Sequence, residues 1–234
     1  MPMHRRATAT RTRDPLDAEA RRSAAGPSKW LNFDLLEQLS FYGAYHTNFY
    51  NQVIHVVFVP LIITTVLAFL DYAPPLHKLL PPNAQPHLPA PLDGSLELNN
   101  GLYVVIVYGL FYLKLEPFAG ATWILTHGMG SHFLSTWLHQ QDAWQLAIGL
   151  HVFAWYMQIH PGHGIFERRK PAMMDSLVQA FALAPLFVHL EVLFWMGYRP
   201  RLRIKLAQEV NRRITLIDGG DLHAPLVEAD SGTQ

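Results

Sequence analysis

The chain contains no cysteine among its 234 residues. Disulfide bonds, thiolate metal sites and a cysteine nucleophile are therefore excluded, and any metal ion must bind to His, Asp or Glu side chains. Nitrogen and oxygen donors suit Fe(II), Zn or Cu better than the soft metal states that prefer thiolates.

Charge is also scarce. Charged residues make up only 15% of the chain, well below the quarter or so that is typical of a soluble domain, whereas hydrophobic residues make up 50%. The formal net charge is zero, so nothing indicates a nucleic acid partner. Most charges lie near the two ends and in residues 164–175, with long uncharged stretches between them. This distribution is typical of a polytopic membrane protein.

The composition divides the chain into three regions. We expect a disordered tail over residues 1–29, a membrane-embedded domain over 30–206 that would carry any functional site, and a second tail over 207–234. The first tail lacks the apolar run of a secretory signal peptide, and its acidic residues disfavour a mitochondrial transit peptide. Repeated prolines indicate a loop insertion over residues 72–100.

The apolar segments predict an all-α, multipass membrane helical bundle. Residues 53–70 are uncharged and would extend about 27 Å as a helix, just enough to cross a bilayer. Further apolar segments lie at 101–113, 118–138, 144–159 and 176–198, and residues 30–46 predict an interfacial amphipathic helix. We expect about four to six membrane-embedded helices, some of them short or re-entrant.

Two clusters of basic residues flank the segment 176–198, one at 168–170 and the other at 199–205. The positive-inside rule places both clusters on the same side of the membrane, which a single straight span between them forbids. We therefore expect residues 176–198 to form a hairpin bent at Pro185.

Five histidines lie inside or at the ends of apolar segments: His46, His55, His151, His160 and His163. A polar ring in such a segment is costly without a partner, so several together indicate a metal site or a proton path. The alternative is that each ring bonds separately to a backbone carbonyl. Their grouping beside helix breaks favours a metal for His46, His55 and His163.

The spacing of these histidines also predicts where helices end. His46 and His55 are nine residues apart, which places them on opposite faces of one straight helix. A break at residues 48–51 would let both rings face one point. Pro161 is expected to end the next helix at His160, and His163 and Glu167 would share a face of a helix starting near Gly164.

Two blocks of sequence resemble the 2-hydroxy fatty acid dioxygenases, a family of fungal endoplasmic reticulum membrane enzymes of phytosphingosine degradation. The first block is residues 39–51 (LSFYGAYHTNFYN), followed by Ile54-His55 and Val59-Pro60. The second is residues 162–172 (GHGIFERRKPA), continued by 175–179 (DSLVQ), 184–187 (APLF), Glu191 and 197–200 (GYRP). The chain departs from the family pattern at residues 158–163, where it has one extra residue and one extra histidine.

The resemblance implies an Fe(2+)-dependent dioxygenase in the endoplasmic reticulum membrane. Its partners would be O2, a 2-hydroxy long-chain fatty acid that is shortened by one carbon in α-oxidation, and the lipid bilayer. Such an acid can chelate a metal through its hydroxyl and carboxylate groups.

The resemblance also ranks the candidate site residues. His46, His55 and His163 become the leading ligands, with Glu167 beside them in the catalytic group, while His151 and His160 are further metal candidates. Arg168 could attract the substrate carboxylate, although it could instead serve only to set membrane orientation. Tyr45 could form a hydrogen bond near the metal, and Glu191 could orient a ligand histidine or pair with an arginine.

Two rival functions remain open at this stage. A zinc-dependent membrane lipid hydrolase would use the same histidines without O2. A non-enzymatic membrane protein that binds or transports lipid would use them as a proton relay.

Overall fold

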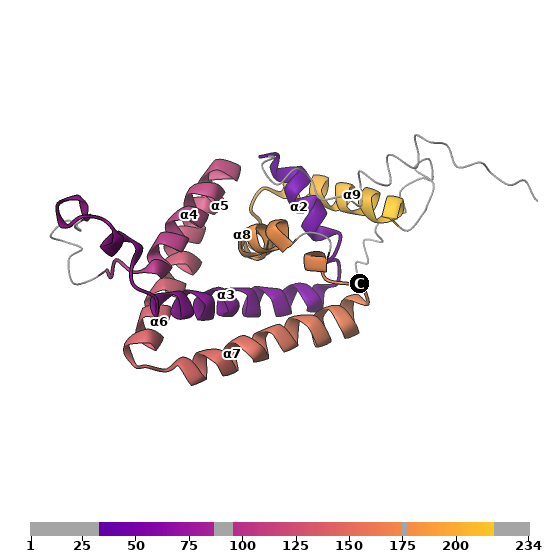
Figure 1. Ribbon diagram of the computed structural model, residues 1–234. Coiled ribbons are helices and arrows are strands. Elements are labelled where there is room, and N and C mark those ends of the chain that lie inside the picture. Colours follow the sequence, from indigo (N-terminus) through magenta and orange to yellow (C-terminus); the bar gives the residue numbers. More distant parts are fainter. Residues whose placement is uncertain (1–32, 87–95, 175–176, 218–234) are drawn as a thin grey trace, which may run out of the picture.

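A computed structural model describes residues 33–86, 96–174 and 177–217 of the chain (Figure 1). Every regular element in these ranges is a helix, which confirms the all-α class. The elements are α2 (Leu35–Gly43), α3 (Phe49–Asp71), η1 (Leu76–Leu79), η2 (Pro82–Ala84), α4 (Asn100–Leu115), α5 (Pro117–Trp123), η3 (Ile124–Gly128), α6 (Met129–Gln140), α7 (Trp144–Met157), η4 (Gln158–Glu167), η5 (Ala172–Met174), α8 (Leu177–Trp195) and α9 (Pro200–Ile217). The expected tail at 1–29 lies outside the described residues, and α9 continues beyond the boundary expected at residue 206.

Helix α3 lies at the centre of the fold. It contacts α4, α6, α7, α8 and η4, and Figure 1 shows α7 running alongside it. The helix begins where Asn48 accepts hydrogen bonds from the backbone N–H groups of Tyr50 and Asn51. Its side chains are apolar on nearly every face, as a helix surrounded by other helices requires.

One stretch among the described residues, Phe49–Leu79, is long and apolar enough to cross a membrane by length and composition. The apolar helical stretches Asn100–Leu115 and Ala180–Trp195 are shorter than a full span. A multipass bundle of four to six embedded helices therefore remains a prediction.

The hairpin expected over residues 176–198 is wrong. Helix α8 runs unbroken from Leu177 to Trp195 with Pro185 inside it. A proline removes one backbone hydrogen bond without necessarily ending a helix, and α8 packs against α2, α3 and α5.

The helix break expected at Pro161 is also wrong. Residues Gln158–Glu167 form a π-helix, η4, which continues directly from α7 through the proline. In a π-helix the backbone bonds reach one residue further than in an α-helix, which relieves the clash between a proline ring and the carbonyl four residues earlier. His163 therefore projects from a continuous helix that packs against α3.

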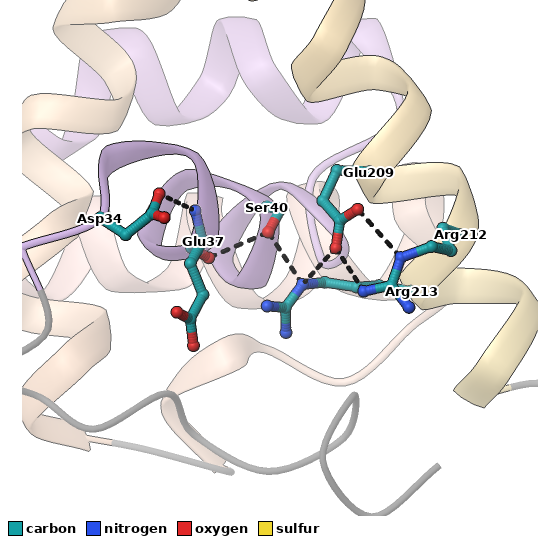
Figure 2. Close-up of polar contacts among 6 residues, drawn as sticks. All are labelled: Asp34, Glu37, Ser40, Glu209, Arg212 and Arg213. Carbon is teal, nitrogen blue, oxygen red and sulfur yellow. Dashed lines mark hydrogen bonds and ion pairs between the residues drawn. The ribbon is translucent and has the colours of Figure 1, made fainter. Parts of the chain in front are cut away.

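Helix α9 fixes the position of α2, and with it the chain that leads to the site. Figure 2 shows the polar contact between them, in which the Arg213 guanidinium donates a hydrogen bond to Ser40 Oγ at 2.8 Å. Arg213 also lies 3.7 Å from Glu209 of its own helix. The helices also approach closely at Gly43, where a Cβ atom would lie 2.8 Å from Val210. The end of α2 is therefore held on one side by α9 and on another by α8.

Candidate metal centre

Three histidines from separate parts of the fold meet at one point. His46 follows α2, His55 lies near the start of α3 and His163 lies on η4. Their candidate ligand nitrogens all lie within 4.8 Å of one another. Within the ranges that the structure describes, this is the one group of three or more His, Asp or Glu residues arranged to hold a metal ion.

Backbone carbonyls orient two of the three rings. His46 Nδ1 lies 2.9 Å from the Tyr42 carbonyl oxygen, and His55 Nδ1 lies 2.9 Å from that of Asn51. A carbonyl can only accept, so each Nδ1 carries the proton and donates it. Each Nε2 is left with a free lone pair, which is the tautomer that a metal ligand requires.

Burial keeps the imidazoles neutral. The three rings are 2–4% exposed, and burial, together with the neighbouring His55 and His163 rings, holds the pKa of His46 well below its ordinary value. Burial also lowers the pKa of His163, although the nearby Glu167 carboxylate acts in the opposite direction. Neutral imidazole is the metal-binding form.

Two ring nitrogens at the centre have no protein partner. His46 Nε2 and His163 Nδ1 are buried and make no hydrogen bond within the described part of the chain. Buried polar atoms are normally paired, and an unpaired one costs about 1–3 kcal/mol. Three neutral, converging imidazoles, two of them with an unpaired nitrogen, fit a first-row divalent ion such as Fe(2+), for which nitrogen donors are well suited.

Glu167 lies beside the histidines, and its carboxylate is hydrogen-bonded to other residues. Its carboxylate accepts hydrogen bonds from Thr47 N at 2.9 Å, Thr47 Oγ1 at 2.6 Å, Asn48 N at 2.9 Å and Asn51 Nδ2 at 3.0 Å. It therefore joins η4 to the link between α2 and α3. We refer to these four residues as the Glu167 clasp.

A cavity of about 70 Å³ opens next to the three histidines. Its polar lining also includes Tyr42 and Gln158. The rest of its wall comes from apolar or aromatic side chains on α3, on α7 with η4, on the η5 region and on α8: Val59, Ile62, Ile63, Trp155, Ile159, Pro171, Met173, Ala180, Phe181, Ala184 and Pro185. This arrangement can exclude water and accept an alkyl group beside a metal ion.

The other two histidine candidates lie outside the cluster. His151 on α7 accepts a hydrogen bond from Trp155 Nε1 at 3.0 Å, so its Nδ1 carries the proton and donates to Thr65 Oγ1 at 2.8 Å. It thereby ties α7 to α3. His160 is exposed and its ring stacks on Tyr156.

The candidate substrate and supporting residues lie at the edge of the site. Arg168 is exposed in a left-handed backbone conformation just after η4, and Tyr45 is buried against Phe41. Glu191 lines a second cavity of about 380 Å³, together with Arg203 and with His46, which also borders the first cavity.

Sequence reasoning missed the residues that support the ligands. Tyr42 and Asn51 each lie four residues before a ligand histidine, and this spacing is the signal that could have identified them, because a helix brings such a ring near that carbonyl. Gln158 could have been noticed as an uncharged polar residue in an apolar segment five residues before His163.

Comparison with known proteins finds one family model and one curated relative that match the chain. Residues 33–196 match the family model described as "2-hydroxy-palmitic acid dioxygenase Mpo1-like". The chain is also 34% identical over 180 residues to the 2-hydroxy-palmitic acid dioxygenase MPO1 of Saccharomyces cerevisiae, covering 76% of this chain and 90% of that relative. No solved structure shows a significant match. The matched region contains all three clustered histidines.

Proposed function

Because the chain belongs to the Mpo1-like family of 2-hydroxy-palmitic acid dioxygenases, we propose that it is an Fe(II)-dependent dioxygenase that shortens 2-hydroxy long-chain fatty acids by one carbon. The observation that carries the proposal is the meeting of three buried, neutral histidines at the wall of an apolar cavity. This combination suits a metal-dependent reaction on a lipid. The other candidate histidines suit it less well, because His151 is hydrogen-bonded to Thr65 and Trp155 and His160 is exposed.

His46, His55 and His163 would hold the iron, whose role when bound is to supply the redox chemistry that O2 requires. With three protein ligands, coordination positions remain for other molecules. The carbonyls of Tyr42 and Asn51 keep the rings in the metal-binding tautomer.

The surrounding residues would position the substrate and support the ligands. Apolar side chains such as Ile62 and Phe181 would contact the first carbons of the alkyl chain and exclude water. Glu167 would help to position the two histidines His46 and His55, because its clasp holds the segment between them. Arg168 and Tyr45 remain proposed contacts for the substrate, and Glu191 remains a proposed support for His46.

We further propose that the protein acts in the endoplasmic reticulum membrane as a multipass protein. The stretch Phe49–Leu79 supports membrane insertion. So do the many large apolar side chains exposed on α4 and α7, among them Val107, Leu110, Val152 and Phe153. Apolar surface on this scale is unusual for a protein surrounded by water. A substrate dissolved in the bilayer could then reach the cavity without crossing water.

Metal analysis of single alanine variants tests the ligand set. We expect His46→Ala, His55→Ala and His163→Ala each to weaken iron binding more than about 100-fold, because even indirect supports of a metal commonly cost 10- to 100-fold. Iron per chain is measured on protein purified in detergent, with His160→Ala as the control that retains it. Retention of iron and turnover by all three variants would contradict the proposal.

The reaction itself is tested with 2-hydroxypalmitate. The iron-loaded protein is expected to convert it in air to an acid shorter by one carbon, and to leave it unchanged under argon. Conversion under argon would point to a hydrolytic or non-oxidative reaction and would overturn the proposed dioxygenase activity.

A further inference from the structure

Gln158 is a buried amide that the protein itself does not satisfy. Its side chain is 6% exposed, and its Nε2 makes no hydrogen bond within the described part of the chain. It lies at the start of η4 and lines the same cavity as the three histidines. A leucine or methionine would fill this position without an unpaired donor, so the amide is costly unless a ligand uses it.

Another nitrogen at the cavity wall already has a partner. Trp155 Nε1 donates to His151 at 3.0 Å, so the indole is committed to the protein. The amide nitrogen of Gln158 is therefore an unpaired N–H donor in a residue that lines the same cavity as the three histidines, and the rest of that lining is mostly apolar.

The chemistry of the substrate supplies what this amide lacks. A 2-hydroxy acid that chelates iron through its hydroxyl and one carboxylate oxygen retains a second carboxylate oxygen. In an apolar cavity that charged oxygen needs a donor, because buried charge without a hydrogen bond is strongly disfavoured. Hydrogen bonds to charged acceptors are also stronger than those between neutral groups.

We propose that Gln158 Nε2 is the carboxylate subsite of this protein and donates to the substrate oxygen that does not bind the metal. This inference rests on the proposed function for the identity of the ligand. It assigns to Gln158 a positioning and recognition role that the three histidines cannot provide, because their free nitrogens are directed to the metal.

The test compares two ligands that differ only in the carboxylate. Binding of 2-hydroxypalmitate and of 1,2-hexadecanediol is measured by calorimetry on iron-loaded protein under argon, where no turnover occurs. Gln158→Met keeps the length of the side chain and removes its polar atoms. We expect it to weaken binding of the acid by about 10- to 100-fold, the usual value of a hydrogen bond to a charged group, and to leave binding of the diol unchanged.

Two further measurements separate recognition from a structural role. Gln158→Met is expected to keep its iron and to raise Tm by about 2–4 °C, because a buried unpaired donor has been removed. A structural role predicts a lower Tm instead. Gln158→Leu provides a second replacement should the first not fold, and Gln208→Leu, on the exposed face of α9, is the control for loss of an amide.

The outcomes are distinct. Unchanged binding of the acid, or equal weakening of acid and diol, would overturn the carboxylate subsite. If the wild-type protein binds the acid through Gln158 but does not convert it in air, the subsite stands and the proposed dioxygenase reaction fails.

Discussion

At the scale of single residues, the Glu167 clasp holds the segment that lies between two of the three candidate ligands, His46 and His55. Its carboxylate binds the backbone N–H groups of Thr47 and Asn48 and the side chain of Asn51. His46 directly precedes this segment, and the carbonyl of Asn51 orients His55. The geometry of the site therefore depends on contacts between residues 116 to 120 positions apart in the sequence.

Gly162 leaves the space that the clasp needs. A Cβ atom at Gly162 would lie 2.6 Å from Asn51 Oδ1 and 3.5 Å from His55 Cε1. Asn51 could yield only by losing its bond to Glu167. We expect Gly162→Ala to lower the free energy of unfolding by about 1–3 kcal/mol and to weaken metal binding about tenfold. Thermal unfolding and metal titration in detergent measure the two effects.

Gly164 provides the matched control two residues further along η4. A Cβ atom there would meet its nearest neighbour at 3.5 Å, which is ordinary contact. Gly164→Ala is therefore expected to keep metal affinity and nearly all stability. Equal losses in the two variants would mean that η4 resists any added methyl group, and that Gly162 has no particular relation to Asn51.

At the scale of elements, the apolar runs allowed most helices to be predicted. The run 53–70 lies within α3 (Phe49–Asp71), and 101–113 lies within α4 (Asn100–Leu115). A break at residues 48–51 was also expected, and α3 begins within that stretch, at Phe49, with Asn48 as its cap. These features depend on local patterns, namely uncharged runs long enough for several turns and a side chain able to cap a helix.

The π-helix could not be predicted in this way. Nothing in the pattern of residues 158–167 distinguishes a π-helix from a helix that ends at Pro161. Because η4 continues, His163 faces α3 and His160 faces outward. Sequence reasoning ranked His46, His55 and His163 above His151 and His160, and the packing of η4 and α7 against α3 brings these three together.

A close approach between α4 and α5 gives a prediction at this scale. At Gly120 a Cβ atom would lie 2.5–2.8 Å from the backbone of Tyr112 and Leu113. Backbone atoms inside a helix cannot move aside, so we expect Gly120→Ala to cost about 3 kcal/mol of stability. Gly149→Ala in α7 meets no atom within 4 Å and is expected to gain about 0.5–1 kcal/mol from helix propensity. Tm measurements distinguish the two, and a stable Gly120→Ala variant would contradict this packing.

At the scale of the whole molecule, the candidate metal centre forms only when distant segments are folded together. His46 depends on α2, which α8 and α9 hold in place, His55 depends on α3, and His163 depends on η4. The unfolded chain does not bring these three rings together. A metal ion bound at this site therefore binds the folded state in preference, and its binding free energy adds to the stability of the fold.

This linkage predicts that removing the metal lowers Tm without any change in sequence. At a free metal concentration about 100 times Kd, the stabilisation is about 2.7 kcal/mol, which corresponds to a Tm increase of about 5–10 °C for a chain of this size. A chelator should reverse the increase, and Fe(2+) added under argon should restore it. The variant with His46, His55 and His163 all changed to Ala should unfold at the same temperature with and without metal, whereas His160→Ala should respond like the wild-type chain. If metal stabilised the triple variant as strongly as the wild type, the metal would have to bind to groups other than these three histidines, and the proposed site would be wrong.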